Sequence, residues 1–133
     1  MNSEHIAPCG MNCRLCSGYI RKVKPCPGCR SSAVNKPIYC NTCTIAHCGK
    51  RLSNEWSDCS SCDTPCRRMK ALDKRYRTKY HMSVLENLAM IRRVGMDRFL
   101  DDQRIRFCCP NCGSILSVHR TKCPACQHGM TWD

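Results

Sequence analysis

Four cysteines near the end of the chain have the spacing of a metal site. Two Cys-x-x-Cys pairs, Cys109/Cys112 and Cys123/Cys126, are separated by ten residues. One tight turn presents both sulfurs of a pair to one ion, and two such turns supply the four thiolates of a tetrahedral zinc site. The spacing is typical of a zinc ribbon, and we interpret Cys108, just before the first pair, as a bystander.

The first half of the chain carries two further sets of paired cysteines. Cys13/Cys16 and Cys26/Cys29 are separated by nine residues and predict a second zinc site. The other set, with fifteen residues between its pairs, predicts a third site. Its members are Cys40, Cys43, Cys59 and Cys62.

Three cysteines in this half lie outside the pairs. They are Cys9, Cys48 and Cys66, and two histidines, His5 and His47, lie near two of them. These residues could form a fourth site or exchange with members of the third. The alternative is that some of these cysteines are small buried hydrophobic residues, as unligated cysteines usually are.

Two cysteine triplets also permit iron–sulfur chemistry. Residues 9–16 have the spacing Cys-x-x-x-Cys-x-x-Cys, and residues 59–66 nearly mirror it. Such a triplet with a distant fourth thiolate can ligate a [4Fe–4S] cluster. The Cys-x-x-Cys turns favour zinc, as three or four ions, and a [4Fe–4S] cluster in the N-terminal module is the alternative.

The composition indicates that disulfides or bound metal ions stabilise the fold in place of a large hydrophobic core. The 133 residues include 16 cysteines but only 6% aromatic residues, a density typical of disulfide or metal scaffolds. Residues 1–8 have no basic start followed by an apolar run, so we expect no signal peptide and a cytoplasmic location. No stretch has the length of a membrane-spanning segment, so we expect no membrane partner. Cytoplasmic thiols stay reduced, which favours metal over the alternative of disulfides.

The cysteine-poor middle of the chain has helical periodicity. From residue 66 to about 79, Met69, Leu72 and Tyr76 recur at helical spacing, after a predicted N-cap and first-turn proline at residues 64–65. A second helix begins at Ser83 and ends at Gly95. Its apolar stripe comprises Val84, Leu85, Leu88, Ile91 and Val94. A third, short helix is predicted with its cap at Asp97 and with Phe99, Leu100 and Ile105 as its apolar residues.

These elements predict a small metal-stabilised α+β protein. Residues 1–66 form an irregular cysteine-rich module with several metals, residues 67–107 a basic helical segment packed on it, and residues 108–133 a zinc ribbon. Residues 18–23 suit either a brief helix or a strand. A short hairpin strand is predicted in the ribbon from Ile115, Leu116 and Val118.

The cysteine motifs resemble those of a known family. In order they are Ile6-Ala7-Pro8-Cys9-Gly10-Met11-Asn12-Cys13-x-x-Cys16, Cys26-Pro27-Gly28-Cys29-Arg30, Cys43-Thr44-Ile45-x-x-Cys48 and Cys59-x-x-Cys62-x-x-Pro65-Cys66. Over residues 6 to about 70, this order resembles the small cysteine-rich prokaryotic family called domain of unknown function 3795. The resemblance implies that Cys9, Cys48 and Cys66 belong to the metal scaffold, whereas Cys40 is less typical. The family has no assigned activity, so the resemblance bears on fold and ligands alone.

The charge of the chain predicts an anionic partner. The formal net charge is +12, and three zinc sites of four thiolates each would lower it by about 6, to about +6. Much of the excess lies in the first predicted helix: Arg67, Arg68, Lys70, Lys74, Arg75, Arg77 and Lys79. Such a helix suits the phosphates of RNA or of a ribosome, and the alternative is a solvated face that binds nothing.

The sequence offers no catalytic constellation. No serine–histidine–acid set, glycine-rich phosphate loop or pair of carboxylates stands out, and a zinc ion with four thiolates has no open position for water. We therefore predict a non-enzymatic zinc protein that binds RNA or an RNA–protein assembly, with no small-molecule substrate. The alternative is an iron–sulfur redox or electron-transfer protein.

Overall fold

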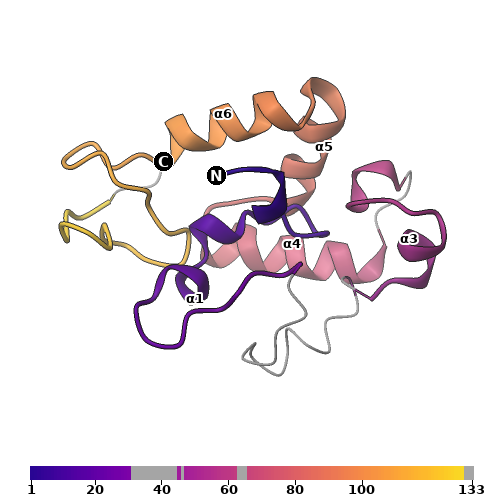
Figure 1. Ribbon diagram of the computed structural model, residues 1–133, viewed down its shortest axis with the longest axis horizontal. Coiled ribbons are helices and arrows are strands. Elements are labelled where there is room, and N and C mark those ends of the chain that lie inside the picture. The colour runs from indigo at the N-terminus through magenta and orange to yellow at the C-terminus, as the bar shows by residue number, and fades with distance from the viewer. Residues whose placement is uncertain (31–44, 46, 63–65, 131–133) are drawn as a thin grey trace.

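A computed structural model describes residues 1–30, 45, 47–62 and 66–130 of the chain (Figure 1). Its helical elements are the 3-10 helices η1 (Ser3–His5), η2 (Cys13–Leu15) and η3 (Cys59–Ser61), and the α-helices α1 (Ser17–Ile20), α3 (Gly49–Ser53), α4 (Arg67–Lys79), α5 (Val84–Val94) and α6 (Met96–Arg106). The predicted ligands Cys40 and Cys43, and the predicted helix start at residues 64–65, lie outside the described residues.

The three long helices confirm the helical middle of the chain. Ser83 caps α5, since its hydroxyl accepts a hydrogen bond of 3.1 Å from the Glu86 amide. Gly95 ends α5 at a φ of +89°, which glycine adopts without a steric penalty. The predicted cap at Asp97 is wrong: α6 begins at Met96 and runs for 11 residues, because Gly95 both ends α5 and caps α6.

The start of α4 also differs from the prediction. Its N-cap is Cys66, which makes no side-chain capping bond, rather than a residue at 64–65. The buried side of α4 includes Met69, as its periodicity predicts. The polar Asp73 is also buried there, where hydrophobic periodicity gave no sign of it.

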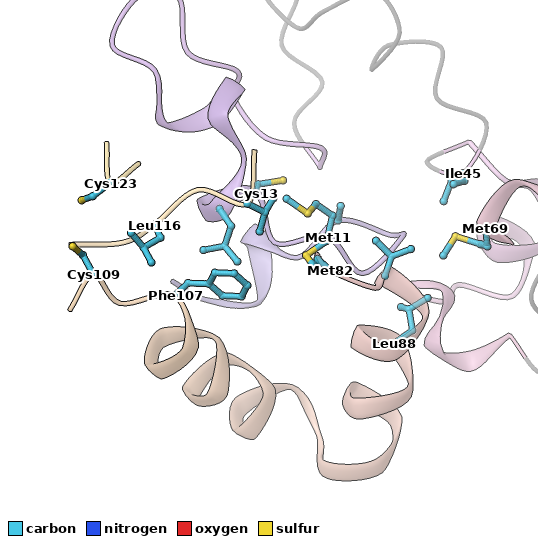
Figure 2. Close-up of a cluster of buried hydrophobic side chains, with 14 residues drawn as sticks. Met11, Cys13, Ile45, Met69, Met82, Leu88, Phe107, Cys109, Leu116 and Cys123 are labelled. Carbon is cyan, nitrogen blue, oxygen red and sulfur yellow. The ribbon is translucent and has the colours of Figure 1, made fainter. Parts of the chain in front are cut away.

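The main core is a band of aliphatic and sulfur-containing side chains with one buried aromatic residue, Phe107 (Figure 2). It runs from Cys109, Cys123 and Leu116 in the C-terminal segment (residues 108–130, which we call the ribbon for brevity), past Phe107, to Met11 in the N-terminal segment. The band continues through Met82, Leu88 and Met69 to Ile45. Cys109 and Cys123, two of the predicted metal ligands, therefore also contribute to this core.

A second cluster fixes the N-terminus between helices. Ile6 is fully buried against Ile91 of α5 and Phe99 and Leu100 of α6, and the N-terminal segment lies between α4 and α6 in Figure 1. Ile105, the third apolar residue of the predicted helix, does not join this cluster. It is 79% exposed, because the buried side of α6 runs through Phe99, Leu100 and Gln103 instead.

The predicted β content is reduced to single bridges in the described part of the chain. Cys108 pairs with Ile115 and Lys122 with Gly129, each as an isolated antiparallel bridge, and the described residues form no strand. Each hairpin is occupied by a cysteine turn, which leaves little length for a ladder. Residues 18–23, which suited a helix or a strand, begin in α1.

None of the helices in the described ranges combines the length and apolar composition that crossing a bilayer demands.

Candidate metal centres

Two tight turns build the C-terminal cysteine group. In the first, the Gly113 amide donates to the Cys109 carbonyl at 2.9 Å, and Gly113 has a φ of +77°. In the second, the Gln127 amide donates to the Cys123 carbonyl at 2.9 Å, and the Cys123 amide donates to the His128 carbonyl at the same distance. Each turn therefore fixes two cysteines on one side of its backbone.

The turns bring four sulfurs together. The Sγ atoms of the four residues all lie within 4.8 Å of one another. The Cys109–Cys126 and Cys112–Cys123 separations are 3.8 and 3.7 Å. Tetrahedral zinc with bonds of about 2.3 Å holds its sulfurs about 3.8 Å apart. The four cysteines can therefore hold one metal ion. They are the same four that the sequence spacing predicts as ligands of this site.

The surroundings favour the thiolate form at Cys112 and Cys126, whereas burial and the neighbouring Cys112 and Cys109 thiols raise the pKa of Cys123 to about 11. Asn111 donates from Nδ2 to the Cys126 sulfur at 3.4 Å. Hydrogen bonds from the hydroxyl and the amide of Ser114 lower the pKa of Cys112 to about 6. Cys108 stays outside the group: its exposed thiol donates to the Gly113 carbonyl at 3.5 Å. Sequence spacing had no means of identifying Asn111 or Ser114 as partners.

The N-terminal pairs lie close together but are arranged differently. The Cys29 amide donates to the Cys13 sulfur at 3.4 Å, and the Cys26 amide donates to the Gly18 carbonyl at 2.7 Å. Burial raises the pKa of Cys16, and the Cys13 and Cys26 thiols add to the effect. Among the described residues, only the ribbon cysteines form a group of three or more ligand atoms that all lie within 4.8 Å of one another. A second zinc site at these pairs stays a prediction.

A further group of cysteines surrounds one cavity. Cys48 is the N-cap of α3, Cys66 is the N-cap of α4, and Cys59 and Cys62 lie at the two ends of η3. All four line a cavity of about 290 Å³. Burial raises the pKa of Cys59 to about 11, an effect that Arg51 opposes and the other three thiols reinforce. Cys48 and Cys66, which the sequence left outside the pairs, thus lie with Cys59 and Cys62.

The remaining predicted ligands have other surroundings. Cys9 is half-buried against the main core. His5 accepts a hydrogen bond of 2.9 Å at Nδ1 from the Asn2 amide and so helps to cap η1. His47 is exposed. In the part of the chain that the structure describes, Cys9, His5 and His47 belong to no set of three or more ligand atoms within 4.8 Å.

A histidine attaches the ribbon to the rest of the protein. His119 accepts at Nδ1 from the Ser17 amide at 3.2 Å, and its Nε2 lies 3.2 Å from the Tyr76 hydroxyl. Its ring also meets that of Tyr80 edge-on at 4.7 Å. An imidazole that accepts at Nδ1 carries its proton on Nε2, which donates to Tyr76. His119 therefore has a structural role at this contact.

The predicted basic helix presents its charges to solvent. Every cation of α4 is exposed, while Met69 and Asp73 face inward. Arg77 is paired with Asp73, with 2.9 Å between Nε and Oδ2. The seven exposed cations are Arg67, Arg68, Lys70, Lys74, Arg75, Arg77 and Lys79.

A second basic feature was not foreseen. An open groove of about 1170 Å³ lies between the segment around α1 and the ribbon. Its cations are Arg14, Arg21, Lys22, Arg120 and Lys122. No acidic side chain is among the residues that line this groove in the described part of the chain. Sequence reasoning missed it because its two walls are about 100 residues apart along the chain.

Comparison with other proteins gives no relative. No family model, no curated protein and no solved structure matches this chain.

Proposed function

We propose that the protein is a non-enzymatic zinc protein that binds structured RNA, alone or within an RNA–protein assembly. The observation that carries the proposal is the outward orientation of the α4 cations around a helix whose one acidic residue, Asp73, is buried. Exposed cations at this density repel one another, and phosphates relieve that repulsion. Zinc in the ribbon would hold the neighbouring segment in place without taking part in chemistry.

The groove supports the proposal because it lies beside α4. Arg75 is close enough to His119 to contribute to the lowering of the His119 pKa, whose larger cause is burial. His119 itself lines the groove with Arg120 and Lys122. The cations on this flank of α4 and in the groove thus form one basic surface, which we call the α4–groove surface. A phosphate backbone could follow it across both features.

The character of this surface favours backbone contacts over base readout. Arginine donates paired hydrogen bonds to phosphate, and arginines make up three of the five groove cations and four of the seven α4 cations. Tyr19 adds one aromatic ring, with the Arg14 guanidinium 5.9 Å from its centroid. We therefore expect recognition of RNA shape and phosphates rather than of sequence.

Charge reversal at matched positions tests the proposal. We expect Lys74→Glu with Arg75→Glu to weaken binding of a structured RNA at least tenfold and to reduce the salt slope by about 2, one for each lost phosphate contact. The control is Arg93→Glu with Arg98→Glu, which changes the net charge equally at exposed positions of α5 and α6. Fluorescence anisotropy over a salt series gives both quantities. Equal losses in the two variants, or no loss in the first, would contradict the proposal.

A further inference from the structure

The cavity between α3, η3, α4 and α5 contains four thiols that zinc geometry does not explain. We propose that it is a binding site for a [4Fe–4S] cluster, with Cys48, Cys59, Cys62 and Cys66 as its ligands. The site differs from the ribbon in position and shape, and it is independent of RNA binding at the α4–groove surface.

The separation of the thiols points to a cluster. The four cysteines line one cavity, yet in the described residues no three of them have sulfurs that all lie within 4.8 Å of one another. A single tetrahedral ion requires sulfurs about 3.8 Å apart, as in the ribbon. A cubane cluster binds each thiolate at a different iron, so its four thiolates stand farther apart than those around one ion.

The order of the ligands along the chain agrees with this geometry. Cys59, Cys62 and Cys66 come from one short segment that spans η3 and the start of α4, and Cys48 comes from the preceding helix. Three closely spaced thiolates with a distant fourth are a common ligand pattern for iron–sulfur clusters. The volume of about 290 Å³ provides room for a cluster of eight atoms, whereas four thiolates around one zinc ion leave no such space.

The other residues that line the cavity are of two kinds, apolar side chains and cations, and both suit a buried anionic cluster. Trp56, Met69, Leu85 and Leu88 supply apolar surface, which would limit access of water to the cluster and tune its potential. A [4Fe–4S] core of charge +2 with four thiolates carries a net charge near −2, which requires cations nearby. The cations that line the cavity are Lys50, Arg51 and Arg92.

Two of these arginines also hold the ligand-bearing loop in place. Arg92 donates from Nε to the Ser60 carbonyl at 2.7 Å, which joins α5 to η3 between Cys59 and Cys62. The buried Arg51 donates to the Trp56 carbonyl at 2.9 Å. The Cys59 amide donates to the Pro8 carbonyl at 2.8 Å. These three bonds hold the backbone of residues 56–60, which carries Cys59, to α5, to α3 and to the N-terminal segment, and such support is what a preformed cofactor site requires.

Anaerobic reconstitution of the full chain with sulfide and equal amounts of ferric and ferrous iron, which together give a core of charge +2 without a further oxidant, tests the site. We expect about four irons and four sulfides per chain, with the broad visible absorption of a [4Fe–4S] cluster. Cys59→Ser with Cys66→Ser should lose at least nine-tenths of the bound iron and the colour while retaining the ribbon metal. The matched variant Cys109→Ser with Cys112→Ser should keep iron and colour and lose that metal. Far-UV circular dichroism of each variant checks that α4, α5 and α6 are still formed.

Several outcomes would overturn the assignment. One is a wild-type chain that binds no iron and sulfide but takes up zinc at this site. Another is full iron content in folded Cys59→Ser/Cys66→Ser. A third is loss of iron and colour in Cys13→Ser with Cys16→Ser but not in the cavity variant, which would place the cluster at the N-terminal pairs. RNA affinity of the Lys74→Glu/Arg75→Glu variant is measured separately, so failure of either proposal leaves the other standing.

Discussion

The hydroxyl of Ser83 donates a hydrogen bond of 2.6 Å to the carboxylate of Asp73, and this contact joins the end of one helix to the middle of another. The same Asp73 oxygen accepts from the Leu85 amide at 3.1 Å, while the Ser83 hydroxyl accepts from Glu86. Asp73 is 2% exposed and pairs with Arg77 through its other oxygen. A helix cap and a buried carboxylate thus support each other.

Removing this carboxylate should destabilise the protein. Asp73→Ala leaves the Ser83 hydroxyl and the Leu85 amide without their acceptor, and we expect the free energy of unfolding to fall by about 1–3 kcal/mol. Chemical denaturation of the metal-loaded protein measures it. The control is Asp101→Ala, which removes an exposed pair with Arg104 and should cost no more than about 0.5 kcal/mol. Equal losses would contradict a special role for Asp73.

A glycine in the N-terminal segment should resist substitution. Gly10 has a φ of +92°, and a Cβ there would lie 2.9 Å from Leu88 Cγ and 3.1 Å from the Val84 carbonyl. We expect Gly10→Ala to lower the free energy of unfolding by about 1–3 kcal/mol, from backbone strain and overpacking against α5.

Gly49→Ala is the matched control for this substitution. A Cβ at Gly49 meets no atom within 4 Å, and α3 begins there. We expect its stability to be unchanged or slightly raised, because alanine favours helix over glycine. If Gly10→Ala is tolerated as well as Gly49→Ala, the N-terminal segment does not pack on α5 as closely as the 2.9 Å approach to Leu88 requires.

Acid should weaken the attachment of the ribbon through His119. Burial, and then the positive charge of Arg75, lower the pKa of His119 from its usual 6.5. The unfolded chain therefore binds this proton more readily than the folded one. The contribution of His119 to the free energy of unfolding is complete above about pH 6.5 and falls as the pH drops below it. Protonation at Nδ1 would also replace the acceptor of the Ser17 amide with a second donor.

Thermal denaturation of wild type and His119→Gln over this pH range measures the effect. Glutamine offers an acceptor and a donor but does not titrate, so we expect a shallower fall in Tm below pH 6.5 than in wild type. Metal content is measured at each pH, so that proton competition at the cysteines is separated from the histidine. Parallel curves for the two proteins at equal metal content would refute this role of His119.

Loss of one ribbon thiolate should abolish metal binding there. Cys112→Ser removes a ligand from the group of four, and we expect a folded ribbon to lose its ion to a chelator that wild type resists. Cys108→Ser changes a neighbouring exposed thiol outside the group and should behave as wild type. Metal analysis after chelator competition distinguishes the two. If the Cys108 variant loses the ion and the Cys112 variant keeps it, the assignment of the ligands is wrong.

Local features of the sequence determined the ribbon group and the bounds of α5. Cys109 and Cys112 belong to one turn, as do Cys123 and Cys126, so their spacing alone fixes how each pair faces an ion. Ser83 and Gly95 act on the backbone beside them, and the structure confirms both. In contrast, the prediction of a cap at Asp97 is wrong, because periodicity does not reveal that one glycine can connect two helices directly.

Only the tertiary structure decided which distant residues meet. Cys48 and Cys66 share a cavity with Cys59 and Cys62, although the sequence permitted other combinations. Tyr76 and His119 are 43 residues apart, and the groove joins segments separated by about 100. The physical reason is that a turn or a cap depends on a few neighbouring dihedral angles, whereas a long-range contact depends on how every intervening element packs. The sequence therefore predicted the C-terminal group of four cysteines, and the packing of α4 and α5 determined how the described cysteines between residues 48 and 66 are grouped.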